Sequence, residues 1–166
     1  TCALPIWADL TVLNPRELGA EPVADIRVRS AELQGIEIPR ELVPLAIDEF
    51  PALFVAAANA RGRTVLRGAE ELRVKESDRI QVMADGLAAI GVRAAPTPDG
   101  MVIDGGAYGG GIVESRGDHR VAMAFATAAL RARSSIVVRE CANVATSFPG
   151  FVDLARRAGL GIEERA

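Results

Sequence analysis

The stretch "RVKESDRI", residues 73–80, gathers cations and carboxylates at the expected start of a helix. Lys75 and Arg79 are i,i+4 neighbours, and Glu76 lies three residues before Arg79, so a first helical turn would carry all three on one face. A solvated capping cluster explains this spacing. Against it, cations are disfavoured at the positive end of a helix unless an anion binds there. The alternative is a site for a phosphate or carboxylate group.

A second charged segment, "GDHR" at residues 117–120, opens an apolar helix. Asp118 has the type and place of an ordinary N-cap. A lone histidine such as His119 is usually structural, and its neighbour Arg120 adds a cation to a helix start. A capping role and an anion-binding role are both open for this segment.

A third segment, "AIDEFP", places Asp48 and Glu49 ahead of Pro51, which is suited to the first turn of a helix. An N-cap carboxylate is the simplest interpretation. A carboxylate buried beside cations would instead be a candidate general acid or base. The three segments together predict a site for a small anionic ligand, built from helix starts.

Composition limits the partners and the kind of site. The chain has 166 residues, a formal charge of −3 and no basic run, which argues against nucleic acid and anionic membranes as partners. Cys2, Cys141 and the single histidine make neither a metal-ligand spacing nor a disulfide framework. No apolar run is long enough for a membrane span. We therefore expect no metal and a reducing cytoplasmic setting.

The elements that must position these residues follow from periodicity. Helix 76–91 is predicted by Ile80, Met83, Leu87 and Ile90 on one face, with Ser77 and Asp78 as caps and Gly91 at the end. Further helices are expected at 45–60, 118–133 and 148–159. Strands are expected at 24–30, 33–39, 63–68, 92–106 (two, around a Pro-Asp-Gly turn) and 134–140. The glycine-rich stretch "DGGAYGGG" is interpreted as a surface turn.

The order of helix, strand, helix and strand occurs twice at similar separations, which indicates a duplicated α/β unit rather than a solenoid. The first residues, "TCALPI", do not match a signal peptide. We expect residues 1–7 to be a non-native scar and residues 8–166 to be an incomplete piece of a longer protein.

"IDEFPAL", "ELRVKESDRI", "DHRVAMAFA" and "TSFPGF", in this order and at these separations, closely resemble the 5-enolpyruvylshikimate-3-phosphate synthase family. The resemblance covers about residues 8–163. It implies an α/β (α+β) fold of repeated βαβαββ-type units, of which this chain would be part of the C-terminal domain. The N-terminal domain and the start of this one would be missing.

The resemblance also implies a reaction and roles. Family members transfer enolpyruvyl from phosphoenolpyruvate to the 5-hydroxyl of shikimate 3-phosphate, with no cofactor. Carried over by motif, Arg79 and Arg120 would bind phosphoenolpyruvate, and Lys75 would bind shikimate 3-phosphate. Asp48 would hydrogen-bond the attacking hydroxyl and accept its proton, and Glu76 would transfer a proton to and from the methylene carbon. Asp118 and His119 would support these residues. Thr146 stands where many members have lysine.

Two other functions are weighed against this one. A non-catalytic anion-binding or assembly module would use the same charges without turnover. The related UDP-N-acetylglucosamine enolpyruvyl transferases share the fold, but "KESDR" and "DHR" are typical of the shikimate branch. The partners expected are the two substrates and the missing N-terminal domain, with a monomer as the full-length state.

Overall fold

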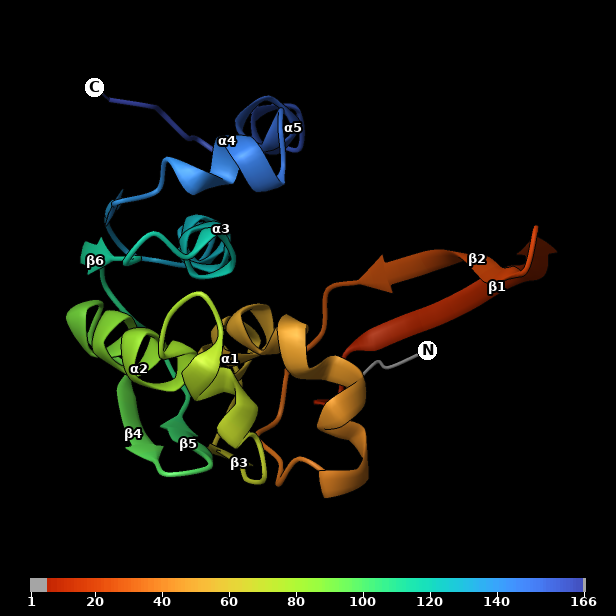
Figure 1. Cartoon of the computed structure of the whole chain (residues 1–166), viewed down its shortest axis with the longest axis horizontal. Coiled ribbons are helices and arrows are strands. Elements are labelled where there is room, and N and C mark those ends of the chain that lie inside the picture. The colour runs from red at the N-terminus through yellow and green to blue at the C-terminus, as the bar shows by residue number, and fades with distance from the viewer. Residues whose placement is uncertain (1–5, 166) are drawn as a thin grey trace.

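The computed structural model describes residues 6–165, in which a long hairpin projects from a body of helices and short strands (Figure 1). The strands are β1 (Asp9–Leu18), β2 (Glu21–Arg29), β3 (Arg63–Leu66), β4 (Arg93–Thr97), β5 (Gly100–Asp104), β6 (Gly111–Glu114) and β7 (Ile136–Arg139). The α-helices are α1 (Phe50–Ala58), α2 (Arg79–Ala89), α3 (His119–Ala128), α4 (Asn143–Ser147) and α5 (Phe151–Arg157). Short 3₁₀ helices are η1 (Arg40–Leu42), η2 (Pro44–Glu49) and η3 (Glu70–Val74).

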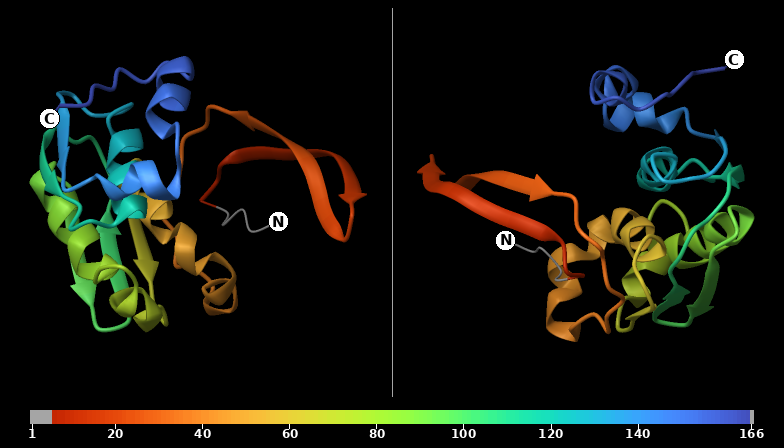
Figure 2. Two further views of the ribbon diagram at one scale, coloured as in Figure 1. Left: turned by 45° about the horizontal axis from the view of Figure 1, so that its top comes forward. Right: turned by 180° about the vertical axis from the view of Figure 1, so that it is seen from behind.

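The hairpin of β1 and β2 extends away from the body in every view (Figure 2). Cross-strand neighbours on one of its faces are apolar and exposed, namely Leu10 opposite Val28 and Val12 opposite Ile26. The strand predicted at 24–30 is therefore present, but the half-burial expected from its alternation is wrong for this chain, because none of its residues is buried. Strand β1 was not predicted.

The central sheet has the order β3-β5-β4, with both outer strands antiparallel to β5. The predicted strand pair around Pro98 and Asp99 is confirmed. Helices α1 and α2 lie against one face of this sheet (Figure 1), and Met101 and Ile103 of β5 are buried beneath them. The helices pack on this sheet, which thereby positions their N-terminal ends.

The predicted duplication is visible in the pairing. β6 and β7 are parallel strands joined by α3. Around α1, residues 33–38 lie parallel to residues 61–65 through the bridges Gln34–Arg61 and Glu37–Val65. The unbroken strand predicted at 33–39 is wrong, since only these isolated bridges form. The helix-strand-helix order nevertheless recurs, as α1-β3-α2 and α3-β7-α5.

The glycine-rich stretch before β6 is not the surface turn that we expected. A Cβ atom on Gly105 would lie 2.1 Å from the carbonyl oxygen of Ala60, and one on Gly110 would lie 2.0 Å from that of Ser135. Tyr108 between them is buried, and its hydroxyl donates to the carbonyl of Ala128. The glycines are needed because the backbone crosses other backbone at contact distance.

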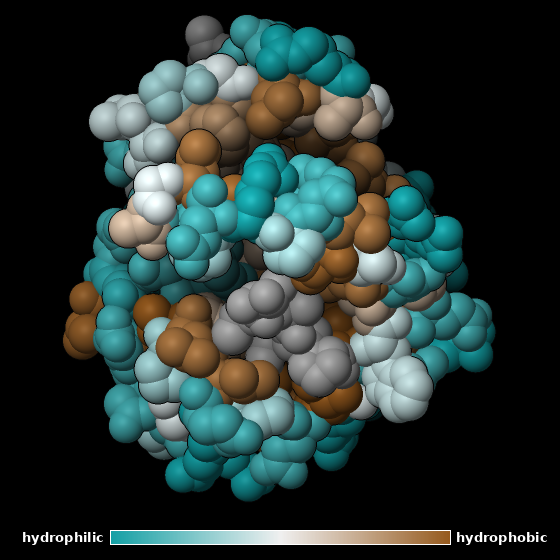
Figure 3. All heavy atoms as spheres, turned by 90° about the vertical axis from the view of Figure 1, so that its right-hand side faces the viewer, coloured by the Kyte–Doolittle hydropathy of each residue, from teal (hydrophilic) through white to brown (hydrophobic). Residues whose placement is uncertain are grey.

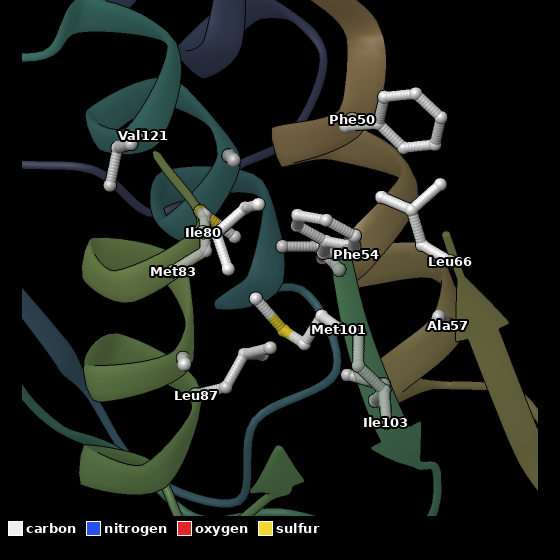
Figure 4. Close-up of a cluster of buried hydrophobic side chains, with 14 of the residues drawn as sticks. Phe50, Phe54, Ala57, Leu66, Ile80, Met83, Leu87, Met101, Ile103 and Val121 are labelled. Atoms are coloured by element: carbon white, nitrogen blue, oxygen red, sulfur yellow. The ribbon is translucent and has the colours of Figure 1, made fainter. Parts of the chain in front are cut away.

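The hydrophobic core lies between the helices and β5 (Figure 4). Ile80, Met83 and Leu87 of α2 are fully buried, as their spacing predicts, and each contributes about 1.5–3 kcal/mol through burial. A Cβ atom on Gly86 would lie 2.4 Å from the ring of Phe125, so this glycine permits the close crossing of α2 and α3. The core thereby fixes where these two helices begin.

The sequence predicts a helix near the C-terminus and a non-native segment at residues 1–7. The predicted C-terminal helix is α5, which ends at Arg157, shortly before Gly159 with its positive φ of 94°. Of the expected scar at residues 1–7, residues 1–5, with Cys2, lie outside the described part, and the scar stays a prediction. No helix among the described residues has the length and apolar character that crossing a membrane requires.

Candidate active site

The three charged segments singled out in the sequence meet around the guanidinium of Arg79. Its Nε donates to Oδ2 of Asp118 at 2.8 Å, and its Nη1 donates to Oδ1 of Asp48 at 3.0 Å. Its Nη2 donates to Oε2 of Glu76 at 2.6 Å. One cation thus joins η2, the start of α2 and the start of α3.

Burial divides these three ion pairs into two kinds. The side chains of Arg79 and Asp118 are 1% and 0% exposed, whereas those of Asp48 and Glu76 are 46% and 51% exposed. Burial raises the pKa of Asp118, but hydrogen bonding and charge attraction from Arg79 outweigh it and hold this pKa below 3.8. Asp118 is therefore a fixed, ionised counterion, and the two exposed carboxylates are the partners that can exchange.

Asp118 is also the N-cap of α3, as predicted. Its Oδ1 accepts from the backbone N–H groups of Arg120 (3.0 Å) and Val121 (3.3 Å), and its Oδ2 accepts from the hydroxyl of Ser77 (3.0 Å). The expected capping role of Ser77 at α2 is wrong. Asp78 alone caps that helix, by accepting from the N–H of Gln81.

Lys75 and Glu76 lie before α2 rather than in its first turn, because the cap at Asp78 starts the helix at Arg79. Lys75 is in an extended conformation, and its Nζ lies 2.5 Å from Oε1 of Glu71 and 3.5 Å from Oδ1 of Asp48. The hydrogen bond to Glu71 is the main reason why the pKa of Lys75 is raised. The loop places the ammonium group beside the Asp48–Arg79 pair.

Asp48 lies in η2 and does not cap α1, so the capping interpretation is wrong for it. The N-cap of α1 is Glu49, which makes no side-chain capping bond. Burial raises the pKa of Asp48, but Lys75, Arg79 and Arg120 together hold it below 3.8. This carboxylate is therefore ionised and lies among three cations.

Arg120 and His119 stand at the first turn of α3. Nη1 of Arg120 donates to the backbone oxygen of Asp48 at 2.9 Å and to Oε1 of Glu49 at 3.2 Å, and its side chain is 33% exposed. His119 is half-buried at the start of the helix. Thr146 lies exposed in α4.

Sequence reasoning missed the contacts that support this cluster. Glu49 holds Arg120, Ser77 bonds Asp118, and Arg73 donates to Asp78 at 2.6 Å. The only sequence signal for Glu49, Ser77 and Arg73 was their position within or next to the charged motifs. Within residues 6–165, no group of three or more His, Cys, Asp or Glu side chains is placed to hold a metal ion.

Comparison with known proteins matches this chain to one family. The family model for EPSP synthase (3-phosphoshikimate 1-carboxyvinyltransferase) matches residues 5–154. A 3-phosphoshikimate 1-carboxyvinyltransferase from Methylococcus capsulatus is 69% identical over 94% of this chain and 36% of the relative, and one from Alkalilimnicola ehrlichii is 66% identical over 93% and 35%.

A solved structure of EPSP synthase from Acinetobacter baumannii is 55% identical, with a TM-score of 0.92, and covers 95% of this chain and 38% of that one. The chain spans about a third of the length of the curated relatives it matches. The predicted fold class, with helices and strands mixed, is confirmed by this likeness. The chain belongs to the EPSP synthase (3-phosphoshikimate 1-carboxyvinyltransferase) family.

Proposed function

We propose that this chain supplies part of the active site of an enzyme that transfers enolpyruvyl from phosphoenolpyruvate to the 5-hydroxyl of shikimate 3-phosphate. The observation that carries the proposal is the meeting of Asp48, Glu76 and Asp118 on buried Arg79, in a member of this family. Both substrates are small polyanions, which charged hydrogen bonds from arginine and lysine recognise well. The new C–O bond forms between the 5-hydroxyl oxygen and the enolpyruvyl carbon, the C–O bond from that carbon to the phosphate group breaks, and the hydroxyl proton goes to Asp48.

The proposed roles are those that the family resemblance implies. Asp48 accepts the proton of the attacking hydroxyl, and its lowered pKa keeps it in the base form at neutral pH. Glu76 protonates and then deprotonates the methylene carbon. Lys75 binds shikimate 3-phosphate, and Arg120 binds phosphoenolpyruvate. Asp118 keeps Arg79 charged and in place, and His119 lies beside it as a supporting residue.

Arg79 can bind a substrate anion only by an exchange of partners. All three nitrogens of its guanidinium donate to carboxylates, and the side chain is 1% exposed. We propose that an incoming phosphoenolpyruvate replaces the half-exposed Asp48 or Glu76 on Arg79, while Asp118 stays. The displaced carboxylate loses a cation and becomes more basic, which suits proton transfer.

We further propose that residues 8–166 are an incomplete C-terminal domain. In the repeat, hairpin β1–β2 stands before α1 as β4–β5 stands before α3. The inner side chains of β5 lie buried under α1 and α2, whereas the apolar face of β1–β2 is exposed. Hydrophobic residues lie at the surface on the side from which the hairpin projects (Figure 3). The helices that cover this face belong to the preceding part of the longer protein.

The full-length protein is proposed to act as a cytoplasmic monomer with no other partner than its substrates. The competing function is a module that binds anions without turnover, and Lys75, Arg79 and Arg120 would serve it equally. The observation that favours the enzyme is the pair of half-exposed carboxylates, Asp48 and Glu76, which repel anions. A module that only binds anions has no use for them.

The 166-residue chain by itself is expected not to turn over, because positioning two substrates requires groups from both sides of a cleft. Phosphate release is measured with both substrates, first for the purified chain, then after addition of the separately expressed preceding part of the protein (the N-terminal domain together with the missing start of this one), and finally for the full-length protein. We expect release only in the last two mixtures. Steady turnover by the chain alone would contradict the half-site. No release by the full-length protein would contradict the proposed function.

Arg120→Lys in the full-length protein is expected to lower kcat/KM by roughly 30–150-fold, which corresponds to about 2–3 kcal/mol of transition-state binding. Lysine keeps the charge but cannot make the planar two-donor contact with a carboxylate. The measurement is steady-state kinetics with phosphoenolpyruvate varied. Arg139→Lys is the control, because Arg139 forms an exposed pair with Glu114 on β6. Wild-type kcat/KM in Arg120→Lys would exclude the role.

A further inference from the structure

We infer that Arg73 is a positioning residue that fixes the loop carrying Lys75 and Glu76, an inference that rests on the function proposed above. Arg73 is the fourth residue of η3 and precedes this loop directly. Arg73 opens the charged stretch at residues 73–80, but neither the motif resemblance nor the charge pattern assigns it a role. Its importance follows from where its three hydrogen bonds go.

The loop itself has little support from the backbone. In the part of the chain that the structure describes, the backbone groups of Lys75, Glu76 and Ser77 form no turn, loop or cap hydrogen bond. The loop is held by side chains instead, with Ser77 on Asp118 and Glu76 on Arg79. Its position therefore depends on how firmly its two ends are anchored.

Arg73 anchors both ends. Its Nη1 donates to Oδ2 of Asp78 at 2.6 Å, across the loop, while Oδ1 of Asp78 caps α2. Its Nε donates to the carbonyl of Pro98 at 2.8 Å, and its Nη2 donates to the carbonyl of Thr97 at 2.5 Å. One guanidinium thus clamps the loop between the start of α2 and the β4–β5 turn.

The β4–β5 turn is a suitable anchor because it is itself fixed to the segment before η3. Asp99 accepts from the backbone N–H of Gly68 through its carboxylate (2.9 Å) and from that of Ala69 through its carbonyl (2.7 Å). A Cβ atom on Gly100 would lie 2.0 Å from the carbonyl oxygen of Leu66, so the turn passes this backbone at contact distance. The β4–β5 turn is therefore hydrogen-bonded to the segment just before η3 and, through Arg73, to the end of η3.

The two substrates depend on this clamp to different degrees. Lys75 and Glu76 lie on the clamped loop, whereas the two arginines proposed to bind phosphoenolpyruvate are held from outside it, Arg79 by Asp118 and Asp48 and Arg120 by η2. Loss of the clamp should therefore affect shikimate 3-phosphate and the proton-transfer step more than phosphoenolpyruvate binding. A merely structural role would not separate the two substrates.

The test compares Arg73→Ala with Arg63→Ala in the full-length protein. Arg63 is the matched control, because it also ties neighbouring segments of the same sheet, through two hydrogen bonds to Asp104. For Arg73→Ala we expect a KM for shikimate 3-phosphate about tenfold higher and kcat lower by about 10–100-fold, the scale of an ångström of misplacement. The KM for phosphoenolpyruvate should change less than twofold, and added guanidinium should restore part of kcat.

A second measurement does not depend on turnover. Hydrogen exchange at the amides that are hydrogen-bonded at the two ends of the loop, Leu72 (to Ala69) and Gln81 (to Asp78), should become faster in Arg73→Ala and stay unchanged in Arg63→Ala. Equal exchange in the two variants, or an equal rise of both KM values, would overturn the inference. If the unsubstituted full-length protein released no phosphate, the proposed function would fail, and the exchange experiment would still decide whether Arg73 positions the loop.

Discussion

Asp118→Asn is expected to lower the free energy of unfolding by about 3–5 kcal/mol, the cost of removing one partner of a buried ion pair. Asparagine caps a helix as well as aspartate does, so the cap of α3 is kept, while the charge and the oxygen that accepts from Arg79 and Ser77 are lost. Arg79, at 1% exposure, then keeps only the two half-exposed carboxylates as counterions. The buried cation is left undercompensated.

Denaturant unfolding of the full-length protein measures this loss. The matched control is Asp104→Asn, since Asp104 also pairs with an arginine, Arg63, but that arginine is 64% exposed. Exposed pairs contribute about 0–1 kcal/mol, so the control should change little. In the double variant Arg79→Met with Asp118→Leu, stability should partly return, because no buried charge is left without a partner. If Asp118→Asn lowered the free energy of unfolding no more than Asp104→Asn does, the Arg79–Asp118 ion pair would not be important for stability.

Glu76→Gln is expected to reduce kcat by roughly 10²–10⁴-fold, the usual cost of losing a general acid–base group. Glutamine can still accept the hydrogen bond from Arg79, but it cannot carry a proton. Stability should hardly change, because Glu76 is 51% exposed and Asp78, not Glu76, caps α2. The two effects are measured by single-turnover kinetics and thermal unfolding on the same preparation.

The control for this variant is Glu114→Gln. Glu114 is a carboxylate of similar exposure that pairs with Arg139 between β6 and β7. It should leave kcat and the unfolding midpoint unchanged. A Glu76→Gln protein that unfolds easily while its folded fraction keeps full kcat would assign Glu76 to structure and remove it from the reaction.

Local signals in the sequence determined the main helices of this protein. Helix α2 is the clearest case, because Ile80, Met83 and Leu87 recur on one face, Asp78 caps its start and Gly91 follows its end with a φ of 91°. Caps and apolar periodicity act within one or two turns, so they can be read without knowing the fold. The motifs likewise indicated which charged residues belong together.

Tertiary structure alone decided how those charges are arranged. Asp48 and Asp118 lie 31 and 39 residues from Arg79 in the chain, and only the packing of α1, α2 and α3 brings them to one guanidinium. The capping roles expected of Ser77 and Asp48 failed for the same reason, because each found a better partner on a distant segment. Burial of Arg79 also had no local signal, since a cation can leave water only where several separate segments supply its counterions at once.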